Sequence, residues 1–197
     1  MIILSIDTCG LLYSIAIIKN NEVISHVKAS DKNMQCEELV LKIELLMRKS
    51  SVTYKNIDVI VVTSGPGTFN GVRIGISATY GISLARGIKI ATISTLEVVA
   101  YRNKTTAVCF TPDSQIGFFQ KFDSKFQPLS EVMEVKLDAV DENSLLVFDI
   151  NSYDSSEVSN AISAGLLYIT RGRAESSIFY GKPPSIHAKT DLTTILS

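Results

Sequence analysis

Two short segments carry residues whose types and spacing could bind a phosphate group. Residues 64–67 read Ser-Gly-Pro-Gly, directly after a β-branched apolar run and directly before a helical pattern. A glycine-rich turn at the start of a helix presents unpaired N–H groups and the positive end of the helix dipole to an anion. Asp7 and Thr8 end an apolar run at the start of the chain. The Asp7 carboxylate either faces a ligand or caps its own turn by accepting backbone N–H bonds.

The established phosphate-loop signatures do not match the glycine-rich turn. A Walker loop requires Gly-Lys-Ser/Thr after its spacer, whereas Val72 and Arg73 follow Gly71. The dinucleotide fingerprint requires its third glycine at position 70, which is Asn70. Two interpretations stay open: an anion-binding loop, and a structural turn that seats a closely packed helix.

Strands and helices alternate around these two segments. Residues 57–63 predict a strand that is covered on both faces, and residues 70–86 predict a helix. Small residues recur on one side of that helix at steps of three and four, so a second backbone can approach it closely. Further strands are predicted at residues 1–7, 11–18, 23–27, 89–92, 107–111, 116–122, 132–137 and 145–150, and further helices at residues 33–49, 94–101 and 155–167.

The helix predicted over residues 33–49 is apolar around more of its circumference than one sheet requires. Leu39 and Ile43 lie on one side, whereas Leu41 and Leu45 lie elsewhere on the helix. The extra apolar face needs a second contact. Either the small-residue side of the later helix covers it within the chain, or another subunit does.

Composition limits the classes of protein. The chain has 197 residues, of which 46% are hydrophobic, so it is long enough to bury a core. A net charge of −1 gives no strong basic field for nucleic acid. Its three cysteines are far apart, and its two histidines, His26 and His187, form no local metal motif. We expect a cytoplasmic protein with reduced thiols, no signal peptide and no membrane span.

Three motifs, in the same order, resemble the TsaB family. Residues 65–85, GPGTFNGVRIGISATYGISLA, are similar to the GPGSFTGLRIGLATAKGLA segment of that family. Residues 2–18 resemble its opening, ILAIDTS followed by an apolar strand, and residues 92–100 resemble its vSTLEALA segment. The second half of the chain matches the family much less well.

The resemblance implies the two-lobed α/β fold of actin, sugar kinases and Hsp70 chaperones (the ASKHA, ribonuclease H-like fold). A mixed sheet flanked by helices would form residues 1–103, and a smaller second lobe would form residues 104–197. In that fold the first turn is the phosphate-binding hairpin, and its Asp faces the metal-bound nucleotide. The residues that would form a vestigial nucleotide site are Asp7, Thr8, Gly65 and Gly67.

The resemblance also implies a role without chemistry of its own. TsaB is the smaller partner of TsaD, in a complex that transfers a threonylcarbamoyl group to the adenosine next to the anticodon of ANN-decoding tRNAs. The same resemblance implies a TsaE-like ATPase as a further partner and a homodimer in the absence of TsaD. It implies that tRNA is contacted only through the complex. The partners would use ATP and a metal, whereas the chain itself would need no cofactor or metal. The residues expected at the partner interface are Glu37, Leu41, Leu45, Gly71, Arg73, Gly75, Ala78 and Ile82.

The sequence departs from the family at two motifs. Residues 35–37 read Gln-Cys-Glu where relatives carry His-Ser-Glu, and residues 112–115 read Pro-Asp-Ser-Gln where relatives carry Asp-Ala-Arg-Arg. The alternative function is a small kinase or ATPase of the same fold that uses Asp7 and the loop 65–75. That alternative requires phosphate-binding elements in the second lobe, and no such motif is recognisable in the sequence.

Overall fold

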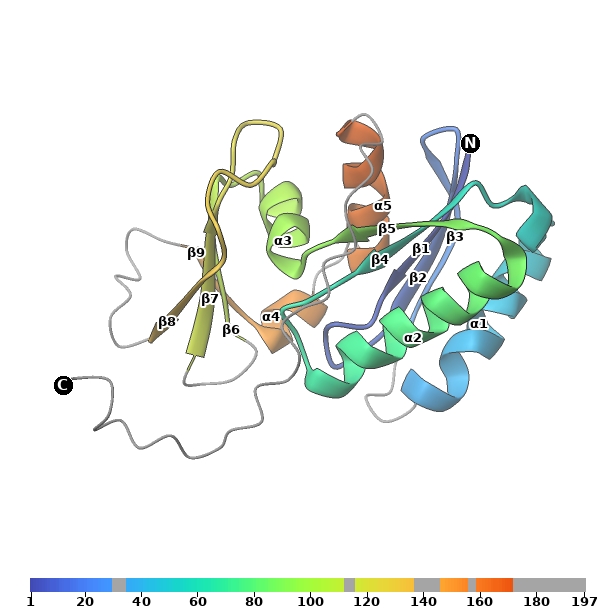
Figure 1. Cartoon of the computed structure of the whole chain (residues 1–197), viewed down its shortest axis with the longest axis horizontal. Coiled ribbons are helices and arrows are strands. Elements are labelled where there is room, and N and C mark those ends of the chain that lie inside the picture. Colours follow the sequence, from blue (N-terminus) through green and yellow to red (C-terminus); the bar gives the residue numbers. More distant parts are fainter. Residues whose placement is uncertain (30–34, 112–115, 137–145, 156–158, 172–197) are drawn as a thin grey trace.

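The strands of the described chain form two sheets (Figure 1). The structure is a computed structural model that describes residues 1–29, 35–111, 116–136, 146–155 and 159–171. The first sheet has five strands in the order β3-β2-β1-β4-β5, in which β1 pairs antiparallel to β2 and parallel to β4. These strands are β1 (Ile2–Asp7), β2 (Ser14–Lys19), β3 (Glu22–Lys28), β4 (Val59–Thr63) and β5 (Lys89–Ile93).

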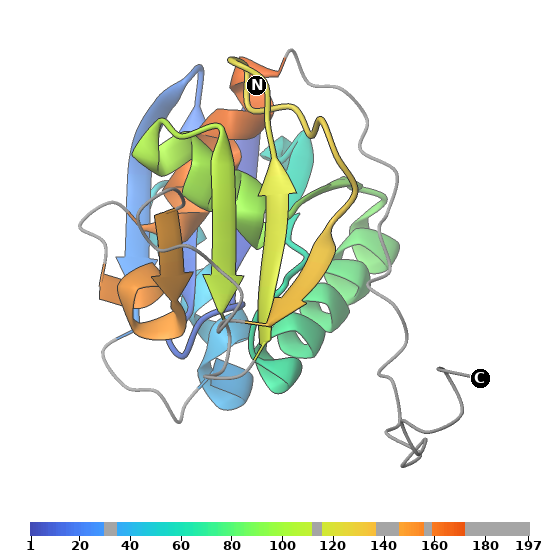
Figure 2. The same ribbon diagram turned by 90° about the vertical axis from the view of Figure 1, so that its left-hand side faces the viewer.

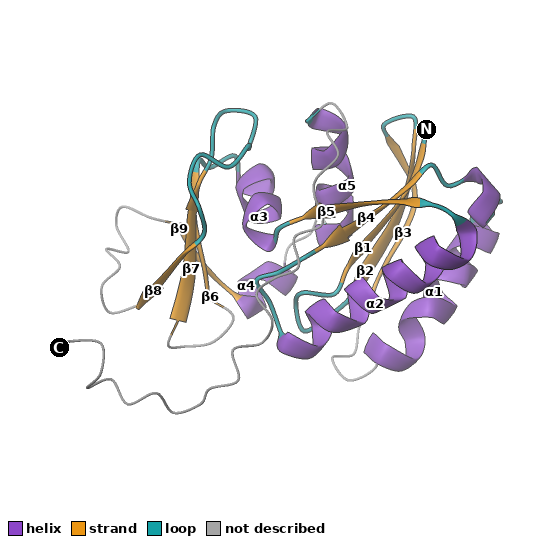
Figure 3. Ribbon diagram, viewed as in Figure 1, coloured by secondary structure: helices purple, strands orange, loops and turns teal. Residues whose placement is uncertain are grey.

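Helices cover both faces of the first sheet (Figure 3). Helices α1 (Gln35–Lys49) and α2 (Phe69–Arg86) lie on one face, and α5 (Asn160–Thr170) lies on the other. Because successive side chains of a strand point to opposite faces, Leu4 joins the core under α1 while Ile3 joins the core under α5. This two-sided burial explains why the central strands read as continuous apolar runs.

The second sheet has four described strands in the order β8-β7-β6-β9, seen in the foreground of Figure 2. They are β6 (Ala107–Thr111), β7 (Ile116–Lys121), β8 (Met133–Lys136) and β9 (Leu146–Asp149). Helices α3 (Thr95–Asn103) and α4 (Ile150–Ser155) lie between the two sheets (Figure 1). Phe110 of β6 and Leu96 of α3 share one buried core with α5, so apolar packing continues across the junction.

The strands divide between the sheets after α3, near the predicted lobe boundary at residue 103. Helix α5 then returns to the first sheet, where it contacts β1, β2 and β4. A Cβ on Gly165 would lie 2.4 Å from the Ile18 side chain, so this approach is close. The boundaries 1–103 and 104–197 stay a prediction, and residues after 103 supply one cover of the first sheet.

Local sequence signals explain where the helices begin and end. Thr68 caps α2 by accepting a hydrogen bond from the Gly71 N–H, and Gly87 ends it with a φ of 67°, a conformation that favours glycine. Ser94 and Glu97 form a capping box at the start of α3, which was predicted as a helix over residues 94–101. One predicted helix, at residues 155–167, was placed wrongly: α4 ends at Ser155, and α5 starts at Asn160 with Ser159 as its cap.

A short 3-10 helix, Tyr54–Asn56, precedes β4. Within the described ranges, no helix combines the length and the apolar character that crossing a bilayer would require. The predicted α/β fold, with mixed sheets flanked by helices, is confirmed.

Candidate functional site

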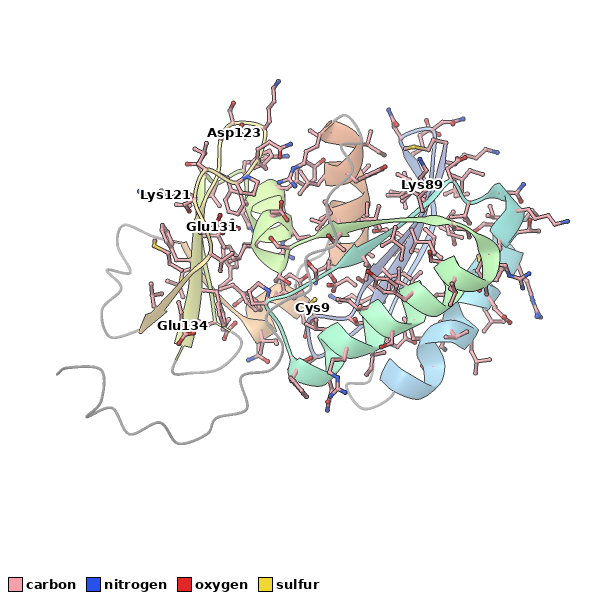
Figure 4. All side chains as sticks on the ribbon, in the orientation of Figure 1. Cys9, Lys89, Lys121, Asp123, Glu131 and Glu134 are labelled. Carbon is pink, nitrogen blue, oxygen red and sulfur yellow. The ribbon has the colours of Figure 1, made fainter. Side chains whose placement is uncertain are left out.

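The turn between β1 and β2 packs directly against the start of α2. The Thr68 N–H donates to the Cys9 carbonyl over 2.8 Å, and the Thr8 hydroxyl donates to the Gly71 carbonyl over 2.6 Å. Figure 4 shows Cys9 at this meeting point, near α4 and the start of α2. The two segments that the sequence singled out as phosphate-binding candidates are therefore one structural unit.

Glycines make this close approach possible. A Cβ on Gly67 would lie 2.4 Å from the Cys9 carbonyl oxygen, and a Cβ on Gly71 would lie 2.0 Å from the Thr8 carbonyl oxygen. A Cβ on Gly75 would lie 2.2 Å from the Thr8 hydroxyl. Gly65 has a φ of 92°, which favours glycine for a conformational reason. The second backbone that approaches α2 at Gly71 and Gly75 is thus the turn of the same chain.

The Asp7 carboxylate is buried beside this turn and takes part in a hydrogen-bond network. Its Oδ1 accepts hydrogen bonds from the Thr63 hydroxyl at 2.6 Å and from the Tyr153 hydroxyl at 2.8 Å. The Cys9 N–H reaches the same oxygen at 3.4 Å. Burial raises the pKa of Asp7, and these donors oppose the rise by stabilising the charged form. The bond to Cys9 agrees with the interpretation of Asp7 as a turn-capping carboxylate.

A second buried carboxylate, Asp154 of α4, reaches the other end of the turn. Its Oδ2 accepts hydrogen bonds from the Leu11 N–H at 2.6 Å and the Leu12 N–H at 3.3 Å, while its carbonyl accepts one from Lys28. A Cβ on Gly10 would lie 1.9 Å from Asp154 Oδ1, so only glycine leaves room for the carboxylate. Burial and the charge of Asp7 raise the pKa of Asp154 to about 6, against the opposing effects of the Leu11 and Leu12 N–H groups and Lys28.

Arg102 fixes α4 from the side of the second sheet. Its Nη1 donates to the Tyr153 carbonyl at 3.2 Å and to Asn160 Oδ1 at 2.6 Å, which joins α3, α4 and α5. Burial lowers the pKa of Arg102, while the negative charges of Asp7 and Asp154 oppose that change. The cation therefore lies near two buried carboxylates without a direct ion pair to either in the described contacts.

The arrangement limits the chemistry available at this junction. A phosphate at the turn would need free N–H groups, but those of Leu11 and Leu12 already bind the Asp154 carboxylate. The Cys9 thiol donates to Thr63, and burial raises the pKa of Cys9 to about 12, so this thiol is not a nucleophile at neutral pH. The described hydrogen bonds thus hold the turn between β1 and β2 against α4 and the start of α2.

A different kind of surface lies on the outer side of α1 and α2, which contact each other. Leu41 and Leu45 of α1 are 61% and 49% exposed, and Leu84 of α2 is 90% exposed. At the start of α2 the Arg73 guanidinium lies 4.9 Å from the centre of the exposed Phe69 ring. We call the set Leu41, Leu45, Phe69, Arg73 and Leu84 the helical face.

Comparison with known proteins gives two kinds of match. The family described as tRNA N6-adenosine threonylcarbamoyltransferase, TsaD, matches residues 22–115. The Bacillus subtilis protein of that name is 32% identical over 120 residues, which is 53% of this chain and 35% of the relative. The tRNA threonylcarbamoyladenosine biosynthesis protein TsaB of Buchnera aphidicola is 32% identical over 101 residues, 51% of this chain and 48% of the relative.

Solved structures extend the match beyond the first half. YeaZ from Pseudomonas aeruginosa superposes with a TM-score of 0.66 at 16% identity, over 88% of this chain and 95% of that one. A second structure, described as similar to peptidase YeaZ from the same organism, has a TM-score of 0.68 over 89% of this chain. The chain is therefore similar to TsaB and TsaD in sequence over about half of its length, and it shares its fold with YeaZ. The sequence matches span about a third to a half of the length of the curated relatives.

The structure places only some of the expected interface residues on the outer surface of α1 and α2. Leu41, Leu45 and Arg73 are exposed on the helical face, whereas Ala78 and Ile82 are half-buried against the first sheet. Glu37 belongs to α1, but its side chain lies outside the described part of the chain, as does the departure at residues 112–115. Gly71 and Gly75 contact Thr8, so only part of the expected set faces outward.

Sequence reasoning missed three residues of the junction: Arg102, Tyr153 and Asp154. Tyr153 and Asp154 belong to the second half of the chain, where the family resemblance is weak, and a Tyr-Asp pair on a six-residue helix carries no recognisable spacing. Their meeting with Asp7 depends on sequence separations of up to 146 residues. Among the described residues, no group of three or more His, Cys, Asp or Glu side chains could hold a metal ion.

Proposed function

We propose that this chain is a non-catalytic, TsaB-like subunit that binds and stabilises a TsaD-type catalytic subunit. The assembled complex would transfer a threonylcarbamoyl group to the adenosine next to the anticodon of ANN-decoding tRNAs. Sequence similarity to TsaB and TsaD proteins supports this proposal, together with the YeaZ-like fold. A TsaE-like ATPase would be a further member of the complex. This chain would contact tRNA only as part of that complex.

The helical face is the observation that carries the proposal. Large apolar side chains are stabilised by leaving water, at about 25 cal/mol per Å² of apolar surface. Leu41 and Leu45 are one helical turn apart, and both are largely exposed although α1 already covers the sheet with Leu39 and Ile43. Exposed large apolar residues on two helices that contact each other are typical of a protein-binding surface. Arg73, which lies over the Phe69 ring, adds an arginine and an aromatic residue, two types that are enriched in such surfaces.

A non-catalytic role is supported by how the polar residues of the junction are used. Asp7 and Asp154 accept hydrogen bonds from the chain itself, and the glycine-rich loop packs on the turn. A general base needs a free path to a substrate proton. These groups instead face other parts of the same molecule, so the kinase alternative has less support.

The test is co-purification with the TsaD-type protein of the same organism. The double substitution Leu41→Glu and Leu45→Glu should weaken binding at least tenfold, because it places two charges in an apolar contact. Its unfolding midpoint should stay near that of the wild type, since both side chains are exposed.

Leu129→Glu is the matched control, because Leu129 is 68% exposed but lies in the segment between β7 and β8 of the second sheet. It should leave binding unchanged. Full binding by the α1 double variant would reject the helical face as the interface. Failure of the wild-type chain to bind any TsaD-type partner would reject the proposed function.

A further inference from the structure

Two neighbouring residues of α4 hold opposite ends of one turn. The Tyr153 hydroxyl donates to Asp7 at the end of β1, and Asp154 accepts from the Leu11 and Leu12 N–H groups. Residues 8–12, which we call the junction turn, therefore lie between α4 and the start of α2. These hydrogen bonds join α4, in the second half of the chain, to residues 7–12 near its start.

The junction turn in turn sets the position of α2. Thr68, the N-cap of α2, bonds to the Cys9 carbonyl through its N–H and to the Gly10 carbonyl through its hydroxyl. Thr8 bonds to the Gly71 carbonyl within the first turn of the helix. Phe69 and Arg73 of the helical face lie in the same stretch. A continuous series of hydrogen bonds thus runs from the Asp154 carboxylate to the start of the helical face.

We propose that Asp154 is a positioning residue whose ionised carboxylate holds the junction turn and thereby sets the start of α2 for partner binding. This inference rests on the proposed function for its consequence, although the holding of the turn is independent of it. A carboxylate binds two N–H groups more strongly than a neutral acid does, because the bonds are charge-assisted. Protonation of Asp154 therefore loosens the turn while the fold persists.

The surroundings of Asp154 place this change near neutral pH. The charged groups that face it are Asp7 of β1, Lys28 of β3 and Arg102 of α3. Burial, with the charge of Asp7, raises the pKa of Asp154 to about 6. Removing Asp7 should lower that pKa, and removing Lys28 should raise it, because their charges act in opposite directions.

Stability and binding should respond to pH in opposite directions. The pKa of Asp154 is higher in the folded chain than its ordinary value of 3.8, so the folded state binds the proton more tightly. The stability that Asp154 contributes is complete below about pH 4 and is lost as the pH rises through about 6. Partner binding should strengthen as the pH rises through about 6, because ionisation of Asp154 tightens the junction turn. A purely structural carboxylate would not separate the two responses.

The first experiment follows the amide resonances of Leu11 and Leu12 by ¹⁵N NMR between pH 4.5 and 8. In the wild type both should titrate with a midpoint near 6, and Asp7→Asn should move that midpoint to lower pH. In Asp154→Asn the titration should disappear. Amides that do not titrate, or that titrate alike in wild type and Asp154→Asn, would overturn the proposal whether or not a partner binds.

The second experiment compares Asp154→Asn with the wild type in urea unfolding and in binding to the TsaD-type protein. At pH 7.5 the variant should unfold at higher urea than the wild type, and the difference should vanish near pH 4.5. Its binding should be about fivefold weaker at pH 7.5, and independent of pH between 5 and 7.5.

Asp123→Asn is the matched control. Asp123 also accepts two backbone N–H bonds, from Lys125 and Gln127, but it lies in the loop after β7 at one end of the second sheet, away from α2 (Figure 4). This variant should change neither the pH dependence of unfolding nor binding. An Asp154→Asn variant that binds like the wild type at pH 7.5, or that is less stable there, contradicts the proposal. Wild-type binding that is absent at every pH would instead reject the proposed function and leave the amide titration to decide the role of Asp154.

Discussion

The junction turn and the helical face both adjoin α2, yet they use polar and apolar residues in opposite ways. At the junction, polar groups such as Asp7 and Thr8 are buried, and their hydrogen bonds are made within the chain. On the helical face, apolar groups such as Leu41 and Leu84 are exposed. The polar residues, which the sequence suggested for ligand binding, thus stabilise the fold. The apolar residues, which would ordinarily form a core, are exposed on the surface.

The glycines of α2 show the same contrast within one helix. Gly71 has no room for a side chain, because a Cβ would lie 2.0 Å from the Thr8 carbonyl oxygen. Gly81 has nothing within 4 Å of that position and lies on the exposed side. Glycines on different sides of one helix therefore have different reasons for being small.

The largest expected effect comes from adding one methyl group to each of these glycines. Gly71→Ala should lower the free energy of unfolding by about 3 kcal/mol, because the backbone of the turn or helix must shift. Gly81→Ala should raise it by about 0.5–1 kcal/mol, since alanine is the better helix former and meets no neighbour. Urea unfolding of both variants measures the difference. Equal effects would mean that the two positions do not differ in packing.

A smaller effect is expected at the link between α4 and Asp7. Tyr153→Phe removes the hydroxyl that donates to Asp7 at 2.8 Å and should lower the free energy of unfolding at pH 7.5 by about 1–3 kcal/mol. The loss should shrink as the pH falls, because a protonated Asp7 needs that donor less. Urea unfolding over a pH series from 7.5 down to the ordinary carboxyl pKa of 3.8 tests this, and a loss that is the same throughout the series would place the effect in packing alone.

The smallest expected effect separates the proposed subunit from the kinase alternative. Mg-ATP at 1 mM, about the upper end of ordinary KM values, should leave the melting temperature of the wild-type chain unchanged, because Asp154 occupies the Leu11 and Leu12 N–H groups. Ligand binding to the folded state must raise the midpoint by mass action. A rise of several degrees would show that the junction turn opens to a nucleotide and would favour the alternative.

The sequence predicted the elements better than their meeting points. Apolar runs located most strands and helices within a few residues, including the helix predicted over residues 94–101. The glycine-rich turn was recognised as sharp, and its structural interpretation agrees with the packing of Gly67 on Cys9. Asp154 and Arg102 went unnoticed, because their roles depend on partners far away in the chain.

By itself, the sequence determined the alternation of strands and helices, the position of the turn and the excess of apolar surface on α1. These are local properties, since they follow from the period of the apolar residues and from the backbone freedom of a few glycines. Only the tertiary structure decided that Thr8 takes the close approach at Gly71 and that Asp154 takes the N–H groups of Leu11 and Leu12. These contacts depend on which distant segments the packed sheets bring together, and no local sequence pattern specifies contacts between residues so far apart in the chain.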